Sequence, residues 1–178
     1  MKGLILNEFV AYAETAFRVA TKGPSSWNAN GRYDPATLMA LVADVGAAND
    51  VPTSEVLRQF GRHLFHRFAA LYPAFFVDGE SCLDFLTDLD TLHVEVQKLY
   101  PDAQFPSFTS TRAGKDRLQL TYRSELGLAD FAEGLLRGCI AYFDEPITLD
   151  RADPPDGGGR IAEFFLERTA RARPPRRA

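Results

Sequence analysis

Hydrophobic residues in the first hundred positions recur at the three- and four-residue steps of amphipathic helices. The first such face consists of Leu6, Phe9, Val10, Ala13 and Phe17. Residues 21–32, which follow, include glycine, proline, serine and asparagine, and these residues favour turns over regular structure. The chain is therefore expected to begin with a helix and to continue into a loop.

Two more helices are predicted, because residues typical of a helix N-terminus are followed each time by apolar residues at helical spacing. Asp34 before Pro35 is typical of an N-cap with proline at the first helical position. Thr53 repeats the start signal, and Glu55 stands in the first turn, where the helix dipole favours an acid. The two stripes are Leu38, Leu41, Val42 and Val45, and then Val56, Leu57, Phe60 and Leu64.

A fourth helix is predicted between Cys82 and Tyr100, because apolar residues again recur at helical spacing and Pro101 would stop the helix. His93 lies on the same face as the apolar residues. That face is formed by Leu86, Leu89, Val96 and Leu99.

The hydrophobic period changes after Phe105. Leu118, Leu120 and Tyr122 alternate with polar residues, as in a half-buried strand, and residues 113–116 form the expected hairpin turn. A helix at about 127–143 follows, and then two strands at 147–149 and 161–166 around a turn at 154–159. Since no alternating βαβ pattern occurs, we predict an α+β fold, with an N-terminal helical part followed by an antiparallel sheet with packed helices.

Composition limits the number of domains and the kinds of partner. With 178 residues, the chain forms one domain or two tightly packed subdomains, and a separate catalytic domain does not fit. A hydrophobic fraction of 46% with 14 phenylalanines excludes disorder for most of the chain. The net charge of −4 favours neither a nucleic acid nor a membrane surface as partner. Residues 168–178 are basic and too poor in apolar residues to pack, so we expect a disordered tail after a domain at 1–167.

The sequence also predicts a compartment. No segment has the features of a signal peptide, and no apolar run approaches the roughly 20 residues that cross a bilayer. The two cysteines, Cys82 and Cys139, are far apart in the sequence and lack metal-like spacing, which favours a reducing environment. We therefore expect a cytoplasmic protein.

Three histidines are the candidates for metal chemistry. His63 and His66 are three positions apart in a predicted helix, a spacing that can hold a metal, but no third ligand is evident and a structural role is favoured. His93 interrupts an apolar stripe, and a buried imidazole without partners costs about 1–3 kcal/mol. From the residues alone, a satisfied core histidine is favoured over a metal ligand. The common enzyme motifs GxSxG, GxGxxG, HExxH and the P-loop are absent from the sequence.

Several segments, taken in order, resemble one known family. They are LDTLH at 89–93, KLYP at 98–101, PSF at 106–108 and LTYRSE at 120–125, together with the opening MKG and FGR at 60–62. The chain thereby resembles the haem nitric oxide/oxygen-binding (H-NOX) family, the sensor domain of soluble guanylate cyclase, which also occurs as stand-alone bacterial proteins. The resemblance covers nearly the whole chain outside the basic tail.

The resemblance implies a cofactor, haem b (iron protoporphyrin IX), between a helical part at about 1–65 and a second part at about 66–167. His93 matches the proximal iron ligand, a role that explains an imidazole on an apolar face. Tyr122 and Ser124 match the first two members of a Tyr-x-Ser-x-Arg motif that hydrogen-bonds the haem propionates. Alternation along a strand places both side chains on one face, as that role requires.

The resemblance also implies how the porphyrin is packed. Pro106 matches a proline that presses on the porphyrin and distorts it, while Ile5 and Leu135 match apolar residues of the distal wall. One position departs from the family, because Leu126 stands where the motif has arginine. The charge-assisted contact of that arginine to a propionate is therefore missing.

The choice of gaseous ligand follows from the matching distal positions. Members of the family that hold O₂ use hydrogen-bond donors there, chiefly a tyrosine, whereas this chain has Phe9, Leu64 and Phe131. None of these side chains can donate a hydrogen bond. We therefore expect binding of NO and CO and poor binding of O₂.

By resemblance, the protein is a sensor and not an enzyme, and it would signal to a separate partner such as a histidine kinase or a cyclic-di-GMP enzyme. An alternative is a haem-free interaction module that lost the cofactor when Leu126 replaced the motif arginine. A third possibility is a haem enzyme that handles NO or peroxide. Such an enzyme would need a distal acid, base or arginine, and the apolar distal set speaks against it.

Overall fold

The computed structural model describes residues 1–20, 24, 26–77, 79–101, 103–155 and 157–169. The helices are α1 (Gly3–Ala16), α2 (Pro35–Asn49), α3 (Thr53–Leu71), α4 (Cys82–Thr87), α5 (Leu89–Leu99) and α6 (Ala129–Phe143), with a 3-10 turn η1 (Pro73–Phe75). The strands are β1 (Ser107–Arg112), β2 (Arg117–Arg123), β3 (Ile147–Ala152) and β4 (Ile161–Arg168). The helices-first order confirms the predicted α+β class.

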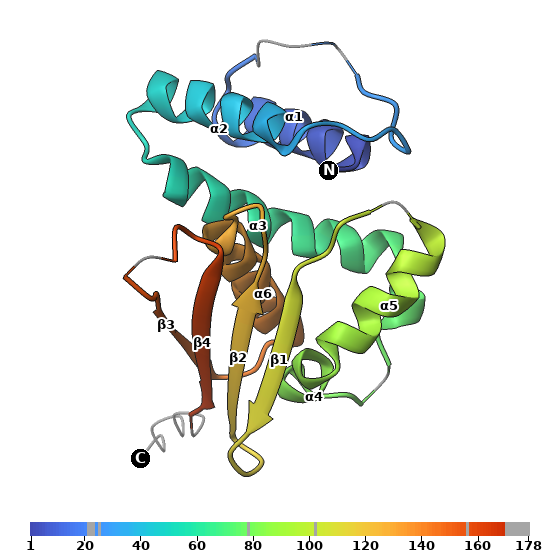
Figure 1. Ribbon diagram of the computed structural model, residues 1–178, viewed down its shortest axis with the longest axis vertical. Coiled ribbons are helices and arrows are strands. Elements are labelled where there is room, and N and C mark those ends of the chain that lie inside the picture. Colours follow the sequence, from blue (N-terminus) through green and yellow to red (C-terminus); the bar gives the residue numbers. More distant parts are fainter. Residues whose placement is uncertain (21–23, 25, 78, 102, 156, 170–178) are drawn as a thin grey trace, which may run out of the picture.

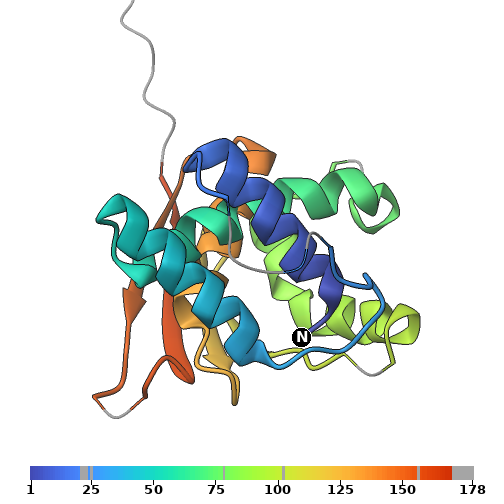
Figure 2. The same cartoon turned by 90° about the horizontal axis from the view of Figure 1, so that it is seen from above.

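Three helices form the N-terminal part. Figure 1 shows α1 and α2 as a layer on one side of α3, with the sheet on the other side, and Figure 2 shows α1 and α2 next to each other. The predicted cap of α2 is present, since the Asp34 carboxylate accepts the Ala36 amide at 2.8 Å. The predicted loop between α1 and α2 lies partly outside the described residues, at 21–23 and 25.

The start of α3 differs from the expectation by one residue. Thr53 is the first helical residue and Pro52 holds the cap position, without a side-chain cap. The Pro52 carbonyl accepts the amides of Glu55 at 2.9 Å and Val56 at 3.1 Å, so the backbone alone closes the first turn.

The four strands form an antiparallel sheet in the order β1-β2-β4-β3, with the predicted hairpin joining β1 and β2. Phe108 of β1 lies opposite Tyr122 of β2, and Tyr122 lies opposite Ala162 of β4. Helix α6 runs between the sheet and α3 (Figure 1). A β-carbon at Gly138 of α6 would lie 2.7 Å from Phe65 Cβ and 2.8 Å from the Arg62 carbonyl oxygen, so α3 and α6 cross in backbone contact.

The expectation of one helix from 82 to 100 was wrong, because the helix breaks at Asp88 into α4 and α5. The buried residues of α4 are Cys82, Leu83, Phe85 and Leu86, whereas no residue of α5 is fully buried. Leu99, which was expected on the buried face, is 57% exposed. The break lets α4 pack into the core while α5 turns its inner face toward a cavity.

Position 168, the expected first residue of the tail, belongs to the sheet. Arg168 is the last residue of β4, where its amide donates to the Asp116 carbonyl at 2.8 Å and its guanidinium pairs with Glu145 at 2.6 Å. The Thr169 amide donates to the Pro146 carbonyl at 2.7 Å. Pairing with the neighbouring strand orders these two residues despite their polar character, and the rest of the expected tail lies outside the described residues.

Two clusters of buried side chains make up the core, and α3 contributes to both. Leu64 belongs to the cluster formed with α1 and α2, and the next residue, Phe65, belongs to the cluster formed with α4, α6 and the sheet. The expected boundary at about 65 therefore falls inside a continuous helix. Within the described residues, no helix is long and apolar enough to cross a lipid bilayer.

Candidate cofactor site

A large apolar cavity lies where the two core clusters meet. The volume of this cavity is about 290 Å³. On the same measure, a cavity that holds one water molecule needs only about 10–15 Å³. Protein interiors are otherwise closely packed, so an apolar space of this size indicates a bound molecule. Its wall includes Leu4, Phe65, Phe68, Phe85, Leu86, Leu89, Leu92, Val96, Phe105 and Phe108, and it draws on α1, α3, α4, α5, α6, β1 and β2.

His93 of α5 lines this cavity, and its Nδ1 atom is buried without a hydrogen-bond partner among the described residues. The imidazole stacks on Phe105 with centroids 5.0 Å apart and lies 5.8 Å from the Phe108 ring. Burial lowers the pKa of His93, and the nearby Pro106 carbonyl and the Asp90 carboxylate offset only part of this effect. The ring is therefore neutral near pH 7, which is the form that binds a metal ion.

Asp90, one turn before His93, fixes the position of α5 against the sheet. Its carboxylate accepts the backbone amide of Phe108 at 2.9 Å, at the start of β1. The aspartate and the histidine thus project from one helix, the first toward β1 and the second into the cavity. This contact gives a structural reason for the Asp-x-x-His spacing in the sequence.

Tyr122 and Ser124 both line the cavity, as strand alternation predicts. Tyr122 is 2% exposed and its ring lies 5.5 Å from that of Phe108. Burial raises the pKa of Tyr122, and the Ser124 hydroxyl and the Leu128 backbone lower it to a smaller extent, so the phenol stays protonated and can donate a hydrogen bond. The Ser124 hydroxyl accepts the Leu126 amide at 3.2 Å, which shapes the turn into α6 and leaves the hydroxyl proton available.

The remaining sequence-predicted residues divide into two groups. One residue, Phe9, does not line the cavity: it is fully buried and packs edge-on against Phe60, with centroids 5.0 Å apart. It belongs to the layer behind the wall, because α1 turns it toward α3. The residues that do line the cavity are Ile5, Leu64, Pro106, Phe131 and Leu135, together with Leu126.

Sequence reasoning missed several polar residues in the wall. Lys2 and Arg32 both line the cavity, although Arg32 comes from an irregular segment where no periodicity could indicate its place. Tyr72 and Tyr100 also line it, and their hydroxyl oxygens are 2.6 Å apart, which joins the end of α3 to the end of α5. The KLYP segment contains Tyr100, but only the fold brings it to Tyr72.

The other two histidines lie away from this cavity. His63 packs against the Tyr12 ring with centroids 4.8 Å apart, and burial lowers its pKa. His66 is exposed on the same helix, with its ring 6.5 Å from that of Tyr142. No group of three metal-ligating side chains occurs within the part of the chain that the structure describes.

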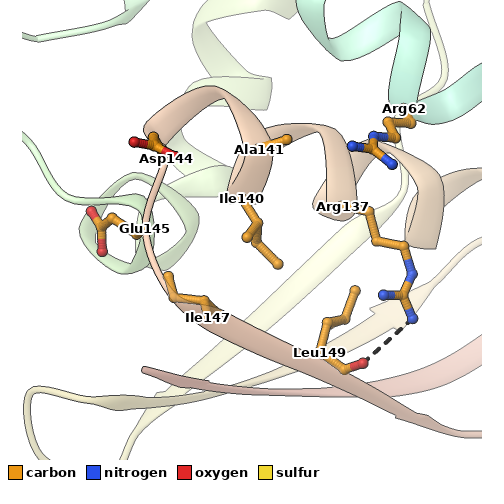
Figure 3. Close-up of a pocket in the computed structure, with 8 residues that line it drawn as sticks. All are labelled: Arg62, Arg137, Ile140, Ala141, Asp144, Glu145, Ile147 and Leu149. Atoms are coloured by element: carbon orange, nitrogen blue, oxygen red, sulfur yellow. Dashed lines mark hydrogen bonds between the residues drawn. The ribbon is translucent and has the colours of Figure 1, made fainter. Parts of the chain in front are cut away.

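A second, smaller pocket lies on the outside of α6 and β3 (Figure 3). Arg137 donates to the Leu149 carbonyl at 3.4 Å and pairs with Glu133 at 2.8 Å. Because both arginines and carboxylates line this pocket, its charge favours neither an anionic nor a cationic ligand. Its lining consists of Arg62, Arg137, Ile140, Ala141, Asp144, Glu145, Ile147 and Leu149.

Comparison with known proteins places this geometry in a family. A model described as haem-NO-binding matches residues 11–151. An H-NOX protein from K. algicida in the unliganded Fe(II) state superposes with a TM-score of 0.85 at 22% identity, covering 96% of this chain and 97% of that one. The H-NOX protein from S. oneidensis in the Fe(II)NO state gives a TM-score of 0.84 at 23% identity, covering 96% of this chain and 100% of that one. An H-NOX variant from T. tengcongensis gives 0.84 at 19% identity, covering 96% and 98%.

Proposed function

Since the chain belongs to the haem-NO-binding (H-NOX) family, whose members are haem-based gas sensors and not catalysts by themselves, we propose that it senses NO at a ferrous haem b. The observation that carries the proposal is His93, a neutral imidazole that lines an apolar cavity. With the Pro106 carbonyl near the ring, the imidazole can bind iron through a nitrogen that faces the cavity.

The residues present fit a haem. Haem, when bound, supplies the iron to which NO and CO bind and two propionates that need polar partners. His93 would hold the iron, while Tyr122 and Ser124 would donate hydrogen bonds to the propionates. Pro106 would pack against the porphyrin, and the apolar wall would exclude water.

Ligand selectivity follows from the distal wall. Ile5, Leu64, Phe131 and Leu135 line the cavity and none of them can donate a hydrogen bond. The bound forms of NO and CO need no donor, whereas bound O₂ is polarised and is stabilised by one. We therefore propose a sensor of NO, able to bind CO and poor at holding O₂.

The fold suggests how the signal would leave the site. Helix α5 has no fully buried residue and joins α4 at the break at Asp88, so it can move relative to the core. Any displacement of His93 acts on α5 and, through the hydrogen bond from the Phe108 amide to Asp90, on β1. The domain would then have two conformational states with different surfaces. A separate signalling protein, such as a histidine kinase or a cyclic-di-GMP enzyme, would respond to the state that it binds better.

The test is an absorbance spectrum of the protein expressed with haem available, recorded in the reduced form under NO, CO and air. A Soret band that shifts with NO and CO, and no stable O₂ complex, is expected. No Soret band would overturn the proposal in favour of a haem-free interaction module, which Leu126 in the cavity wall would then explain. A stable O₂ complex would contradict the proposed selectivity alone.

A further inference from the structure

The turn between β2 and α6 lacks a cation where it meets the cavity. Tyr122 and Ser124 are neutral donors, and Leu126, which also lines the cavity, is apolar. A carboxylate taken out of water costs several kcal/mol unless a positive charge or several donors compensate it. If the cavity holds a haem, as proposed above, a cation from elsewhere in the chain would add to the two neutral donors in stabilising its propionates.

Two side chains with a fixed positive charge line the cavity, Lys2 and Arg32. The Lys2 ammonium already donates to the Asn30 carbonyl at 2.9 Å and lies 5.9 Å from the centre of the Tyr100 ring. The Arg32 guanidinium forms no hydrogen bond or ion pair with any of the described residues. Of the two cations, Arg32 is the one whose charge is available.

The backbone around Arg32 is held firmly although it belongs to no helix or strand. Arg32 forms an antiparallel bridge with Lys2, and the Tyr33 amide donates to the Met1 carbonyl at 2.8 Å. The Gly3 amide donates to the Gly31 carbonyl at 3.0 Å. These contacts fasten the segment before α2 to the start of α1, so the backbone of Arg32 is fixed at the edge of the cavity, which this exposed residue lines.

We propose that Arg32 takes the place of the motif arginine that is missing at Leu126 and binds a haem propionate. A guanidinium offers two parallel N–H donors to a carboxylate, a geometry that an ammonium cannot match. The cofactor is then held from two sides: Tyr122 lies on β2 and Ser124 directly follows this strand, whereas Arg32 belongs to the α1–α2 layer. The propionate contact thereby ties the N-terminal layer to the haem.

The test measures how fast the holoprotein loses haem to an excess of apomyoglobin. The variants are Arg32→Leu, Arg32→Lys and, as a matched control, Arg123→Leu, which removes an exposed arginine of β2 that does not line the cavity. Each variant is loaded once with haem b and once with haem dimethyl ester, in which both propionates are neutral. Thermal unfolding followed by circular dichroism checks that each variant folds.

For haem b, Arg32→Leu should lose the cofactor about tenfold faster than the wild type, Arg32→Lys should lie between them and Arg123→Leu should equal the wild type. For the dimethyl ester, the wild type and Arg32→Leu should lose haem at the same rate. Adding Leu126→Arg to Arg32→Leu should slow the loss of haem b again.

Two results would overturn the role of Arg32 while leaving the sensor function intact. One is an unchanged rate for Arg32→Leu with haem b. The other is an equal acceleration with haem b and with the dimethyl ester, which would mean that Arg32 stabilises the fold rather than a propionate. If the wild type takes up no haem at all, the proposed sensor function fails, and this result is distinct from either outcome for Arg32.

Discussion

The sulfur atoms of Cys82 and Cys139 lie 3.7 Å apart, although 57 positions separate the two residues in the chain. Cys82 begins α4 and Cys139 lies on α6, and both side chains are fully buried as free thiols. Burial and the neighbouring Cys82 thiol raise the pKa of Cys139 well above its usual value. Packing of α4 onto α6 thus makes a thiol pair that the spacing in the sequence does not reveal.

The buried thiol pair should be chemically inert in the folded protein. The thiolate is the reactive form, and the raised pKa of Cys139 removes it there at neutral pH, while burial shields both sulfur atoms from reagents. We expect iodoacetamide to label Cys82 and Cys139 at the rate of global unfolding, and both at once in denaturant, as measured by mass spectrometry. If iodoacetamide labelled Cys139 in the native protein as fast as it labels the thiol of free glutathione, this prediction would be wrong.

His93→Gly should greatly reduce haem binding, because the variant lacks the imidazole that would coordinate the haem iron. We expect the purified variant to show little Soret absorbance and added imidazole to restore it by entering the space left behind. His66→Ala, which removes an exposed histidine of α3, serves as the control and should keep the wild-type spectrum. Equal haem content in His93→Gly and the wild type would rule out His93 as the ligand.

Tyr122→Phe keeps the buried ring beside Phe108 and removes only the hydroxyl. A lost hydrogen bond to a carboxylate costs roughly 1.5–3 kcal/mol, so haem should dissociate about tenfold faster or more. Tyr142→Phe is the matched control, since Tyr142 is 43% exposed and does not line the cavity. The dissociation rate is measured by transfer to apomyoglobin, and an unchanged rate would show that Tyr122 holds no propionate.

The Tyr72–Tyr100 hydrogen bond predicts a sensitivity to alkali. Burial and the contact with Tyr100 raise the pKa of Tyr72 to about 12. Because the folded-state pKa lies above the ordinary value near 10, the unfolded chain ionises first, and stability present below pH 10 is lost as the pH rises toward 12.

The melting temperature of the wild type should accordingly fall more steeply between pH 10 and pH 12 than that of Tyr72→Phe. Circular dichroism at a series of pH values measures both. Parallel curves for the two proteins would mean that the hydroxyl pair contributes nothing to this pH dependence.

Gly138→Ala tests the close crossing of α3 and α6. The new methyl group would meet Phe65 Cβ at 2.7 Å and the Arg62 carbonyl at 2.8 Å, so the helices must move apart, which typically costs about 1–3 kcal/mol. Gly79→Ala is the contrasting variant, because it has open space around the methyl group and only a left-handed φ of 83° to penalise it. Urea unfolding should rank Gly138→Ala as the less stable of the two, and the reverse order would contradict the close crossing.

Much of this arrangement could be predicted from local patterns. Hydrophobic periodicity identified the helices and the alternation of β2, because each depends on which residues face the core a few positions apart. It failed at Asp88, where one helix was expected and two are present, since the helical spacing of apolar residues continues across the break. The family resemblance, not the periodicity, placed Phe9 in the cavity wall, whereas that ring packs against Phe60 and does not line the cavity.

The sequence by itself determined the α+β class, the histidine on an apolar face and the alternation that places Tyr122 and Ser124 on one face, and the family resemblance added the missing arginine at Leu126. These features depend on residue type and short spacings, which are local. Only the tertiary structure decided that Arg32 reaches the wall shared with Leu126, that Tyr72 meets Tyr100 and that Cys82 meets Cys139. Such contacts join residues many positions apart, and they exist only once packing of the two halves around the cavity has brought those residues together.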